Sequence, residues 1–507
     1  MWSKIDSKQI AKYWCIGVIG LMFLAFLLLL YKSRMQSDDL GFIVYIEHHK
    51  GIWNFYQLCR DTFESNIWQL LVIFPGVYLA KYIPHFYIFL VIYLLFGASL
   101  YTFFKKQAVN QKVEPSLFEL ILLAIFFLLF LVFTLWNRDT FQNAVFWLTG
   151  ALSCILTLAL IIWTLQAIDR KPFLLSFILF ILVSNTRSNY ILIFGLLIIF
   201  YLALNFKKEK KHLRYWILNA AAFAIGFVYY ISGEGLKKRL SAVGHDSTRQ
   251  TSVFQSIDIG SAVSGMRHYF TEPGYFLLFT LILFWIFSLY PRIRNIFLFS
   301  IGNLLMLVGG LTIVLFIHEF FISWLLKTNN GYGRMYPFPQ AIFLFLWMSI
   351  CAWLFELGKK ITLRFNLIPF KNIIVLISGP FTLAIVVYIF NHNLRNDIFK
   401  ANRLASEYDA RYAIVEKYRD SLDIRCMVFN RFSNSGIIGF HDIPTTYGCD
   451  FYRSERWFYG GISDYDNWVF QKYLKVPFRL VTVDRFVHLP LNQSDIFYDI
   501  YIKQNQE

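Results

Sequence analysis

Long apolar runs separated by short polar segments dominate the chain. A helix needs roughly 20 apolar residues to cross about 30 Å of hydrocarbon, and eleven runs reach or approach that length. The pattern therefore predicts an all-α polytopic membrane protein with about eleven transmembrane helices. The expected spans are residues 13–31, 85–104, 117–136, 146–167, 172–186, 189–205, 214–232, 275–290, 296–317, 338–357 and 372–391.

One further apolar run, residues 67–80, is shorter and is interrupted by Pro75-Gly76. Apolar runs of about 10–14 residues more often lie at the interface or re-enter the membrane than span it, and proline breaks a helix interior. We expect this run to lie along the membrane, within an external loop that extends from residue 32 to residue 84.

The distribution of basic residues supports this choice, because short cytoplasmic loops of membrane proteins are rich in lysine and arginine. If the N-terminus is cytoplasmic and residues 67–80 do not cross, every short and strongly basic loop falls on the cytoplasmic side. The basic residues concerned are Lys105, Lys106, Lys112, Arg170, Lys171, Lys207, Lys208, Lys210, Lys211, Arg214, Arg292, Arg294, Lys359, Lys360, Arg364 and Lys371. The outward segments are then residues 32–84, 137–143, 233–273, 326–339 and 392–507.

Composition narrows the class of protein further. With 57% hydrophobic and 20% aromatic residues, the chain is too apolar for an ordinary soluble domain. The net charge of +16 sits in short loops rather than on a basic face with interleaved aromatics, which argues against nucleic acid as a partner. The first apolar run follows Lys4, Lys8 and Lys12 but lacks a small-residue cleavage site, so we expect it to be retained as a span.

Residues 392–507 have the pattern of a small α+β domain on the outer face. A polar helix is predicted over 397–420, strands over 425–430, 436–440 and 478–483, and a second helix over 464–474. The segment carries 15 basic and 15 acidic residues, so it is near neutral and better suited to cover a site than to grip anionic lipid. Cys426 and Cys449 lie in it and can pair in an oxidising compartment.

The adjacent acids Asp38 and Asp39 follow the first span at once. Neighbouring carboxylates resist ionising together, which favours one of them as a general base. A solvated turn at a membrane exit is the plainer interpretation of the same pair. Asp139, in the second external loop, is either a further catalytic acid or a helix cap beside Trp136.

Several cations are expected near the same outer face. A departing phosphate needs fixed positive charge rather than a general acid, and arginines at span ends also reach lipid headgroups. The candidates for the donor phosphate are Arg60, Arg138, Arg187, Arg334, Lys237 and Arg239. Arg334 ranks first, because the aromatic segment 331–339 around it is rigid.

His318 and Glu319 lie at the outer end of a long apolar run. Ionisable residues at such depth usually face protein or a water-filled cavity, so a substrate contact or a proton relay is a candidate role. The pair lacks a third ligand, and the chain has no CxxC pair and no HExxH, Walker A, GxSxG or Rossmann pattern. We therefore expect no cofactor and no dedicated metal site, while a divalent cation is conceivable.

Ser37-Asp-Asp-Leu-Gly41 after the first span, Phe146-Trp-Leu-Thr-Gly150 and Asp466-Asn-Trp468 together resemble the GT-C superfamily of membrane glycosyltransferases, in particular bacterial envelope enzymes of the O-antigen glucosyltransferase kind. The resemblance implies a transmembrane catalytic domain over 1–391, Asp38 or Asp39 as base, Asp139 as the second-loop acid, and a possible substrate role for Trp147. In place of the family's His-Glu motif near the fifth and sixth spans stands Asn185-Thr-Arg-Ser-Asn189.

The function that this resemblance implies is an inverting sugar transfer from a polyprenyl-phosphate carrier to a cell-envelope glycan or lipid. The implied location is the bacterial inner membrane, with a cytoplasmic N-terminus and a periplasmic C-terminal domain. Two alternatives stay open from the sequence: an O-antigen-type polymerase or ligase, and a non-enzymatic flippase or transporter of lipid-linked sugars.

Overall fold

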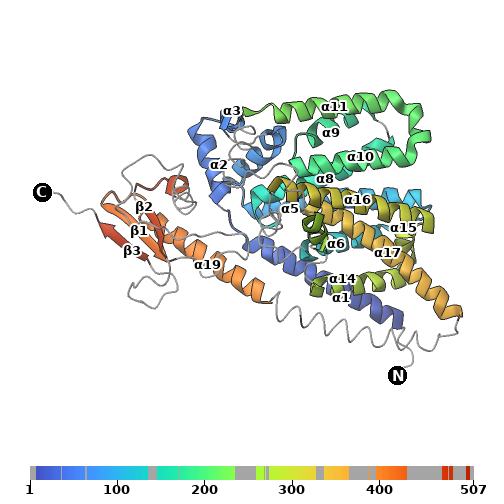
Figure 1. Ribbon diagram of the computed structural model, residues 1–507. Helices are drawn as coiled ribbons and strands as arrows, with labels where there is room; N and C mark the ends of the chain where they lie inside the picture. Colours follow the sequence, from blue (N-terminus) through green and yellow to red (C-terminus); the bar gives the residue numbers. More distant parts are fainter. Residues whose placement is uncertain are drawn as a thin grey trace, which may run out of the picture.

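The computed structural model describes residues 7–35, 37–62, 66–134, 145–170, 172–234, 259–267, 269, 273–326, 336–364, 388, 395–430, 471–477, 479–483 and 498–502, and the structural statements below concern these residues (Figure 1). Most of them are helical. The first part of the chain forms α1 (Ser7–Lys32), α2 (Ser37–His48), α3 (Ile52–Thr62), the π-helix η2 (Gln69–Ile73), α4 (Phe74–Leu79), α5 (His85–Asn110), α6 (Leu117–Thr134), α8 (Leu148–Arg170) and α9 (Phe173–Val183). The second part forms α10 (Ser188–Glu209), the 3-10 turn η3 (Lys210–His212), α11 (Leu213–Ile231), α13 (Ile259–Arg267), α14 (Pro273–Leu289), α15 (Pro291–Phe297), α16 (Ile301–Leu326), α17 (Pro337–Arg364) and α19 (Arg395–Lys417).

Local sequence explains where several helices begin. Pro84 and Pro172 immediately precede α5 and α9, because the fixed φ of proline and its missing N–H are tolerated there but not further inside. At the start of α6, Ser116 and Glu119 form a reciprocal capping box, in which each backbone N–H donates to the other's side-chain oxygen.

Within the described residues, seven helical segments are long and apolar enough to cross a membrane, and eight if the bent pair α14–α15, with its 115° break, counts as one span. The protein is therefore a polytopic, mostly helical membrane protein. The segments are Lys12–Lys32, His85–Asn110, Leu117–Thr134, Leu148–Ile168, Ser188–Ile231, Ile301–Phe320 and Pro337–Ile361.

Eleven spans remain a prediction. The segment Ser188–Ile231 contains two expected spans, α10 and α11, joined by the single turn η3. The expected span 172–186 forms α9, whose 11 residues make a short apolar helix. The expected span 372–391 lies, except for Tyr388, outside the described residues.

Hydrogen bonds between distant segments bring one set of helix ends together. His85 at the start of α5 contacts the carbonyl oxygen of Ser33 after α1 at 2.6 Å. Gln340 in α17 donates to Thr134 Oγ1 at the end of α6, at 3.4 Å. Because α2 also lies there, we call this the acid-pair end of the bundle.

Contacts at the opposite end gather the basic segments. Lys106 near the end of α5 donates to the carbonyl oxygen of Gln166 near the end of α8, at 2.8 Å. Arg294 of α15 pairs with Glu356 of α17 at 3.1 Å. Phe104 and Phe297, with ring centroids 5.8 Å apart, join these two groups of helices. We call this the basic end.

The segment from Asn66 to Ala80 lies against the bundle rather than through it. Trp68, Ile73, Phe74, Val77 and Ala80 are buried, and η2 and α4 are too short to span. Pro75 explains the π-helix, because its ring clashes with the carbonyl four residues earlier and removes a helical donor. The expected membrane-lying segment in the first external loop is thus one short helix, which passes from a π-turn into α4 without the expected break at Pro75 and packs on α8 and α2.

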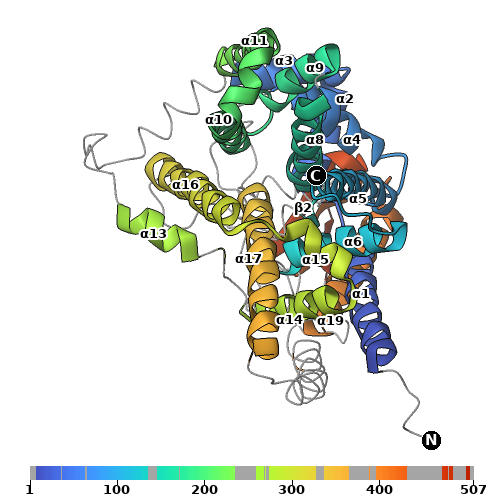
Figure 2. The same ribbon diagram turned by 90° about the vertical axis from the view of Figure 1, so that its right-hand side faces the viewer.

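Helices α6 and α8 are the most deeply buried of the candidate spans, with 78% and 72% of the residues in their most apolar stretch buried in the protein. In the segment Ser188–Ile231 and in α16, only 28% of the residues in the corresponding stretch are buried. Figure 2 shows α13 beside α16, on the outer side of the bundle. Helix α8 therefore lies at the centre of the bundle.

Near the C-terminus, β1 (Ile424–Asn430), β2 (Arg479–Val483) and β3 (Tyr498–Ile502) form one sheet of order β2-β1-β3. Strand β1 pairs with β2 in parallel and with β3 antiparallel. Val415 of α19, Ile424, Met427, Leu474 and Val476 form a small apolar cluster beside the sheet. Strands β1 and β2 lie where the sequence predicts them, whereas 436–440 and most of 464–474 lie outside the described residues, so the complete α+β domain stays a prediction.

Candidate functional site

Asp39 is fully buried at the first turn of α8. Its Oδ1 accepts a hydrogen bond from the backbone N–H of Thr149 (3.0 Å) and another from Thr149 Oγ1 (2.6 Å). A carboxylate at a helix N-terminus satisfies donors that lack helical partners and interacts favourably with the helix dipole. The structure therefore favours a buried, structural role for Asp39 over the solvated turn. Asp38 precedes it in α2, and its side chain lies outside the described residues.

Arg187 binds the same face of α8 one turn further along. Its Nη2 donates to Ser153 Oγ at 3.0 Å. Thr149 and Ser153 are four residues apart, so they lie on one helix face with an axial rise of about 6 Å between them. An acid from α2 and a cation from the turn before α10 thus meet on the first two turns of α8.

The membrane-lying segment packs over the same part of α8. Trp68 Nε1 donates to the carbonyl oxygen of Leu152 at 3.2 Å, and Asn66 Nδ2 donates to that of Thr186 at 3.2 Å. A Cβ on Gly76 would come within 2.8 Å of Leu152 Cδ1. A larger residue here would force the Leu152 side chain to move.

Trp147 is buried immediately before α8, and its carbonyl oxygen accepts the N–H of Ala151 in the first helical turn. Trp147 is thus two residues before Thr149, the partner of Asp39. A substrate role for Trp147 remains a prediction.

Arg60 occupies a different place. Its Nη2 donates to Ser232 Oγ at 2.9 Å, and its guanidinium carbon lies 3.9 Å from the ring centroid of Tyr229. Both partners belong to the last turn of α11, where a cation is favourable for the helix dipole. These contacts give Arg60 a structural role in joining α3 to α11.

His318 and Glu319 form a second buried polar cluster with Tyr269. Tyr269 Oη donates to Glu319 Oε1 at 2.6 Å, while His318 Nδ1 lies 3.3 Å from Tyr269 Oη and 3.4 Å from Glu319 Oε1. His318 Nδ1 therefore faces both oxygens. Its Nε2 has no hydrogen-bond partner in the described part of the chain. A carboxylate orienting an imidazole in this way is the arrangement of a relay or a ligand-binding histidine.

The first turn of α17 separates the two clusters. Gln340 donates to the carbonyl oxygen of Tyr269 at 3.2 Å, and the ring centroid of Tyr336 lies 6.3 Å from that of His318. On the other flank Phe338 packs on Tyr190 of α10, with centroids 5.5 Å apart. The two polar clusters thus lie on opposite flanks of one helical turn.

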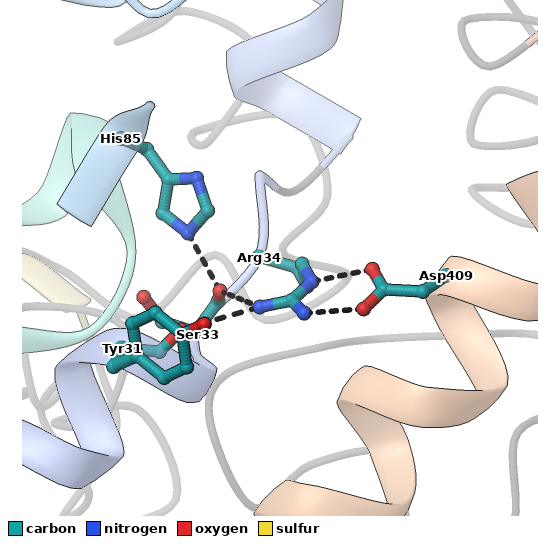
Figure 3. A network of polar contacts seen from close by, with 5 residues as sticks. All are labelled: Tyr31, Ser33, Arg34, His85 and Asp409. Carbon is teal, nitrogen blue, oxygen red and sulfur yellow. Dashed lines mark hydrogen bonds and ion pairs between the residues drawn. The ribbon is translucent and has the colours of Figure 1, made fainter. Parts of the chain in front are cut away.

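A third polar network joins the end of α1 to α19 (Figure 3). Arg34 Nε and Nη2 donate to the two carboxylate oxygens of Asp409 at 2.8 and 2.6 Å. Nearby, a hydrogen bond from Lys81 to Glu47 raises the pKa of Lys81 and joins the turn after α4 to α2. Burial raises the pKa of Tyr408, the neighbour of Asp409 in α19.

The structure brings together Asp39, Arg187 and Trp147 among the residues expected from the sequence, and separately His318 with Glu319. Asp139, Arg138, Arg334, Lys237 and Arg239 lie outside the described residues, so their roles stay predictions. No group of three or more His, Cys, Asp or Glu side chains within the described ranges is placed to hold a metal ion.

Sequence reasoning did not identify Thr149, Ser153, Tyr269, Gln340, Arg34 or Asp409 as partners. Thr149 stands inside the Phe146–Gly150 motif, and Arg34 lies four residues before Asp38. Both residues could therefore have been found from their position in or beside a motif. Asp409 had none, because its partner is 375 residues away.

Comparisons of the chain with protein-family models, with curated proteins and with solved structures gave no match.

Proposed function

We propose that the protein is a membrane glycosyltransferase that moves a sugar from a polyprenyl-phosphate carrier to a cell-envelope glycan or lipid acceptor. The observation that carries the proposal is the meeting of Asp39 and Arg187 on the first two turns of α8. The transfer needs a carboxylate near the acceptor hydroxyl and fixed positive charge near the leaving phosphate. Asp39 anchors the acid pair at the first turn of α8, and Arg187 supplies a cation one turn further along. Asp38, next to Asp39 in the chain, is therefore the proposed carboxylate for the acceptor hydroxyl.

Asp38 is the base in this proposal, and Asp39 is a positioning residue. Asp39 is buried and already accepts two hydrogen bonds from Thr149, whereas a base needs a lone pair within reach of the hydroxyl proton. The acceptor oxygen forms a bond to the anomeric carbon as the bond from that carbon to the carrier phosphate breaks. The hydroxyl proton passes to Asp38, and the displacement inverts the anomeric configuration.

Arg187 is the proposed partner of the leaving phosphate, together with Arg334 and Arg138 from the external loops, and Asp139 is the proposed second-loop acid. The positive-inside rule puts the basic end in the cytoplasm, so the acid-pair end faces the periplasm of a bacterial inner membrane. The C-terminal α+β domain then covers the site from the periplasmic side and holds the acceptor. The mechanism requires no cofactor.

The test is release of carrier phosphate by purified protein in lipid nanodiscs, supplied with a polyprenyl-phosphate hexose and an envelope glycolipid extract. We expect Asp38→Asn to reduce release by at least about 100-fold, the order expected for loss of a general base. Asp38→Asn has a matched control in Asp61→Asn, an exposed acid of α3 near the same bundle end. Wild-type rates in well-folded Asp38→Asn protein contradict Asp38 as base, and no release by the wild type contradicts the transferase.

The buried His318–Glu319 pair favours a second candidate, a flippase or transporter of lipid-linked sugars. Ionisable residues inside a span commonly mark a transport pathway, and this pair lies within the apolar segment Ile301–Phe320. Movement of a fluorescent lipid-linked sugar between leaflets, without phosphate release, would favour the transporter over the transferase.

A further inference from the structure

Arg34 lies in the short link, Ser33 to Met35, that joins α1 to α2. Its Nη1 donates to the carbonyl oxygens of Ser33 (2.9 Å) and Tyr31 (3.3 Å). The guanidinium therefore satisfies carbonyl groups at the C-terminal end of α1, where helical partners are missing. The Ser33 carbonyl also contacts His85 of α5 (Figure 3). The end of α1 and the start of α5 thus both hold the link.

The other edge of the same guanidinium faces α19. The fork of two parallel hydrogen bonds to Asp409 fixes the orientation as well as the distance of the two groups. The side chain of Arg34 is 17% exposed and that of Asp409 is 59% exposed. The arginine is thus held in the bundle surface, and the aspartate reaches it from outside.

An apolar face brings Asp409 to this position. Ala401, Leu404 and Tyr408 of α19 are buried in the main hydrophobic core of the bundle, and their spacing places them on one helix face. Tyr473, further along the chain, packs against the same core and interacts electrostatically with Lys81 and Glu47. The C-terminal segments therefore meet the bundle at both ends of α2.

The acid pair begins four residues after Arg34. Asp39 is held on α8 by Thr149, so the segment from Arg34 to Asp39 is fixed at its two ends, by α19 and by α8. Only Met35 and Gln36 stand between Arg34 and the start of α2 at Ser37, so the link between the two contacts is short. A change in the docking of α19 is therefore transmitted to the first turn of α2.

We propose that Asp409 is a positioning residue, which through Arg34 holds the first turn of α2, and with it Asp38, in place. The C-terminal segments are in this way part of the machinery that sets the geometry of the acid pair. The inference on α2 stands on the contacts alone, while its effect on turnover rests on the proposed function.

Hydrogen exchange and turnover test this inference together, in the full-length protein in nanodiscs. We expect Asp409→Asn to speed amide exchange in α2 and to lower kcat for carrier-phosphate release about 10- to 100-fold, with the donor KM within about 2-fold, because small misplacements of a reacting group are costly. The charge swap Arg34→Asp with Asp409→Arg restores opposite charges and is expected to recover part of both losses. The matched control is Glu416→Gln, which removes the Glu416–Arg419 pair about two turns further along, at the end of α19, and should change neither.

Each result decides the matter. Unchanged exchange in α2 of Asp409→Asn overturns the proposal, and faster exchange with wild-type kcat overturns the positioning role. Equal effects from Glu416→Gln also overturn it, since they indicate general loosening of α19. If the wild type releases no phosphate, the transferase proposal fails, and exchange in α2 alone decides whether the contact holds this turn.

Discussion

At the scale of single residues, the contact between Asp39 and Thr149 has two consequences. The carboxylate satisfies both the N–H and the hydroxyl of a buried threonine, so removing either partner leaves a buried polar group without its bond. It also fixes where α2 lies against α8. The stability of the fold and the placement of the acid pair thus depend on the same hydrogen bonds.

Thr149→Val should lower the free energy of unfolding by about 1.5–3 kcal/mol, the usual range for a hydrogen bond to a charged group. Thr149→Ser should retain most of the stability, because it keeps the hydroxyl. Thr157→Val is the control: Thr157 lies two turns further along α8, and its hydroxyl bonds only to the carbonyl of Ser153 in the same helix, a contact of little value. Denaturant titration in mixed micelles measures the three values, and equal stability of both valine variants would show that the bond from the Thr149 hydroxyl to Asp39 contributes nothing to the fold.

Sequence patterns identified one side of each residue pair and missed the other. Asp39 was found because two adjacent carboxylates follow a span at once, and Arg187 because it is a cation at a span end on the expected outer face. Thr149 and Ser153 were not, since hydroxyl side chains inside an apolar run usually bond to their own helix. Asp409 was beyond prediction, because pairing across 375 residues depends on how α19 docks.

At the scale of elements, hydrophobic length predicted most helices but not how they pack. Helix α9 has 11 residues, so its place in the bundle depends on its neighbours. Asn185, just after α9, donates to the carbonyl oxygen of Gly226 in α11 at 2.7 Å. The expected end of a span at residue 290 agrees with the end of α14 at Leu289, but the residues expected as a loop form the short helix α15, bent by 115° from α14.

Gly226→Ala should separate α9 from α11. The new Cβ would lie 2.8 Å from the carbonyl oxygen of Ile181 and closer still to Ser184 Oγ. Because a backbone atom cannot swing aside, we expect a loss of about 1–3 kcal/mol, typical of overpacking. Gly97→Ala in α5 is the control, since its Cβ would meet nothing within 4 Å and should leave stability unchanged or slightly higher. Thermal unfolding of both variants checks the difference, which vanishes if α9 and α11 do not cross closely at Gly226.

At the scale of the whole molecule, the two bundle ends differ in charge, and this difference bears on the span that lies outside the described residues. Helix α17 runs towards the basic end, where Glu356 pairs with Arg294. Asp409 of α19 lies at the acid-pair end, beside Arg34. The residues on either side of the expected span 372–391 thus lie at opposite ends of the bundle, as that span requires.

Membrane topology follows from this arrangement and can be tested by labelling single cysteines with a membrane-impermeant maleimide in intact cells. Thr62→Cys after α3 and Asp420→Cys after α19 should be labelled from outside, and Lys207→Cys in α10 only after the membrane is permeabilised. The background should carry Cys426→Ser and Cys449→Ser. The other four cysteines are buried, and burial raises the pKa of the Cys59 thiol to about 12, so it stays protonated and unreactive near neutral pH.

The pattern of labelling separates the steps of the argument. Labelling of Thr62→Cys and Lys207→Cys from the same side contradicts the two-ended bundle. A fully reversed pattern keeps the bundle and contradicts only the orientation drawn from the basic loops. If Asp420→Cys and Lys207→Cys are labelled from the same side, the chain does not cross the membrane between α17 and α19. The Arg34–Asp409 contact then cannot form in the membrane. The topology experiment therefore tests the whole-molecule arrangement and the contact that holds α2 at once.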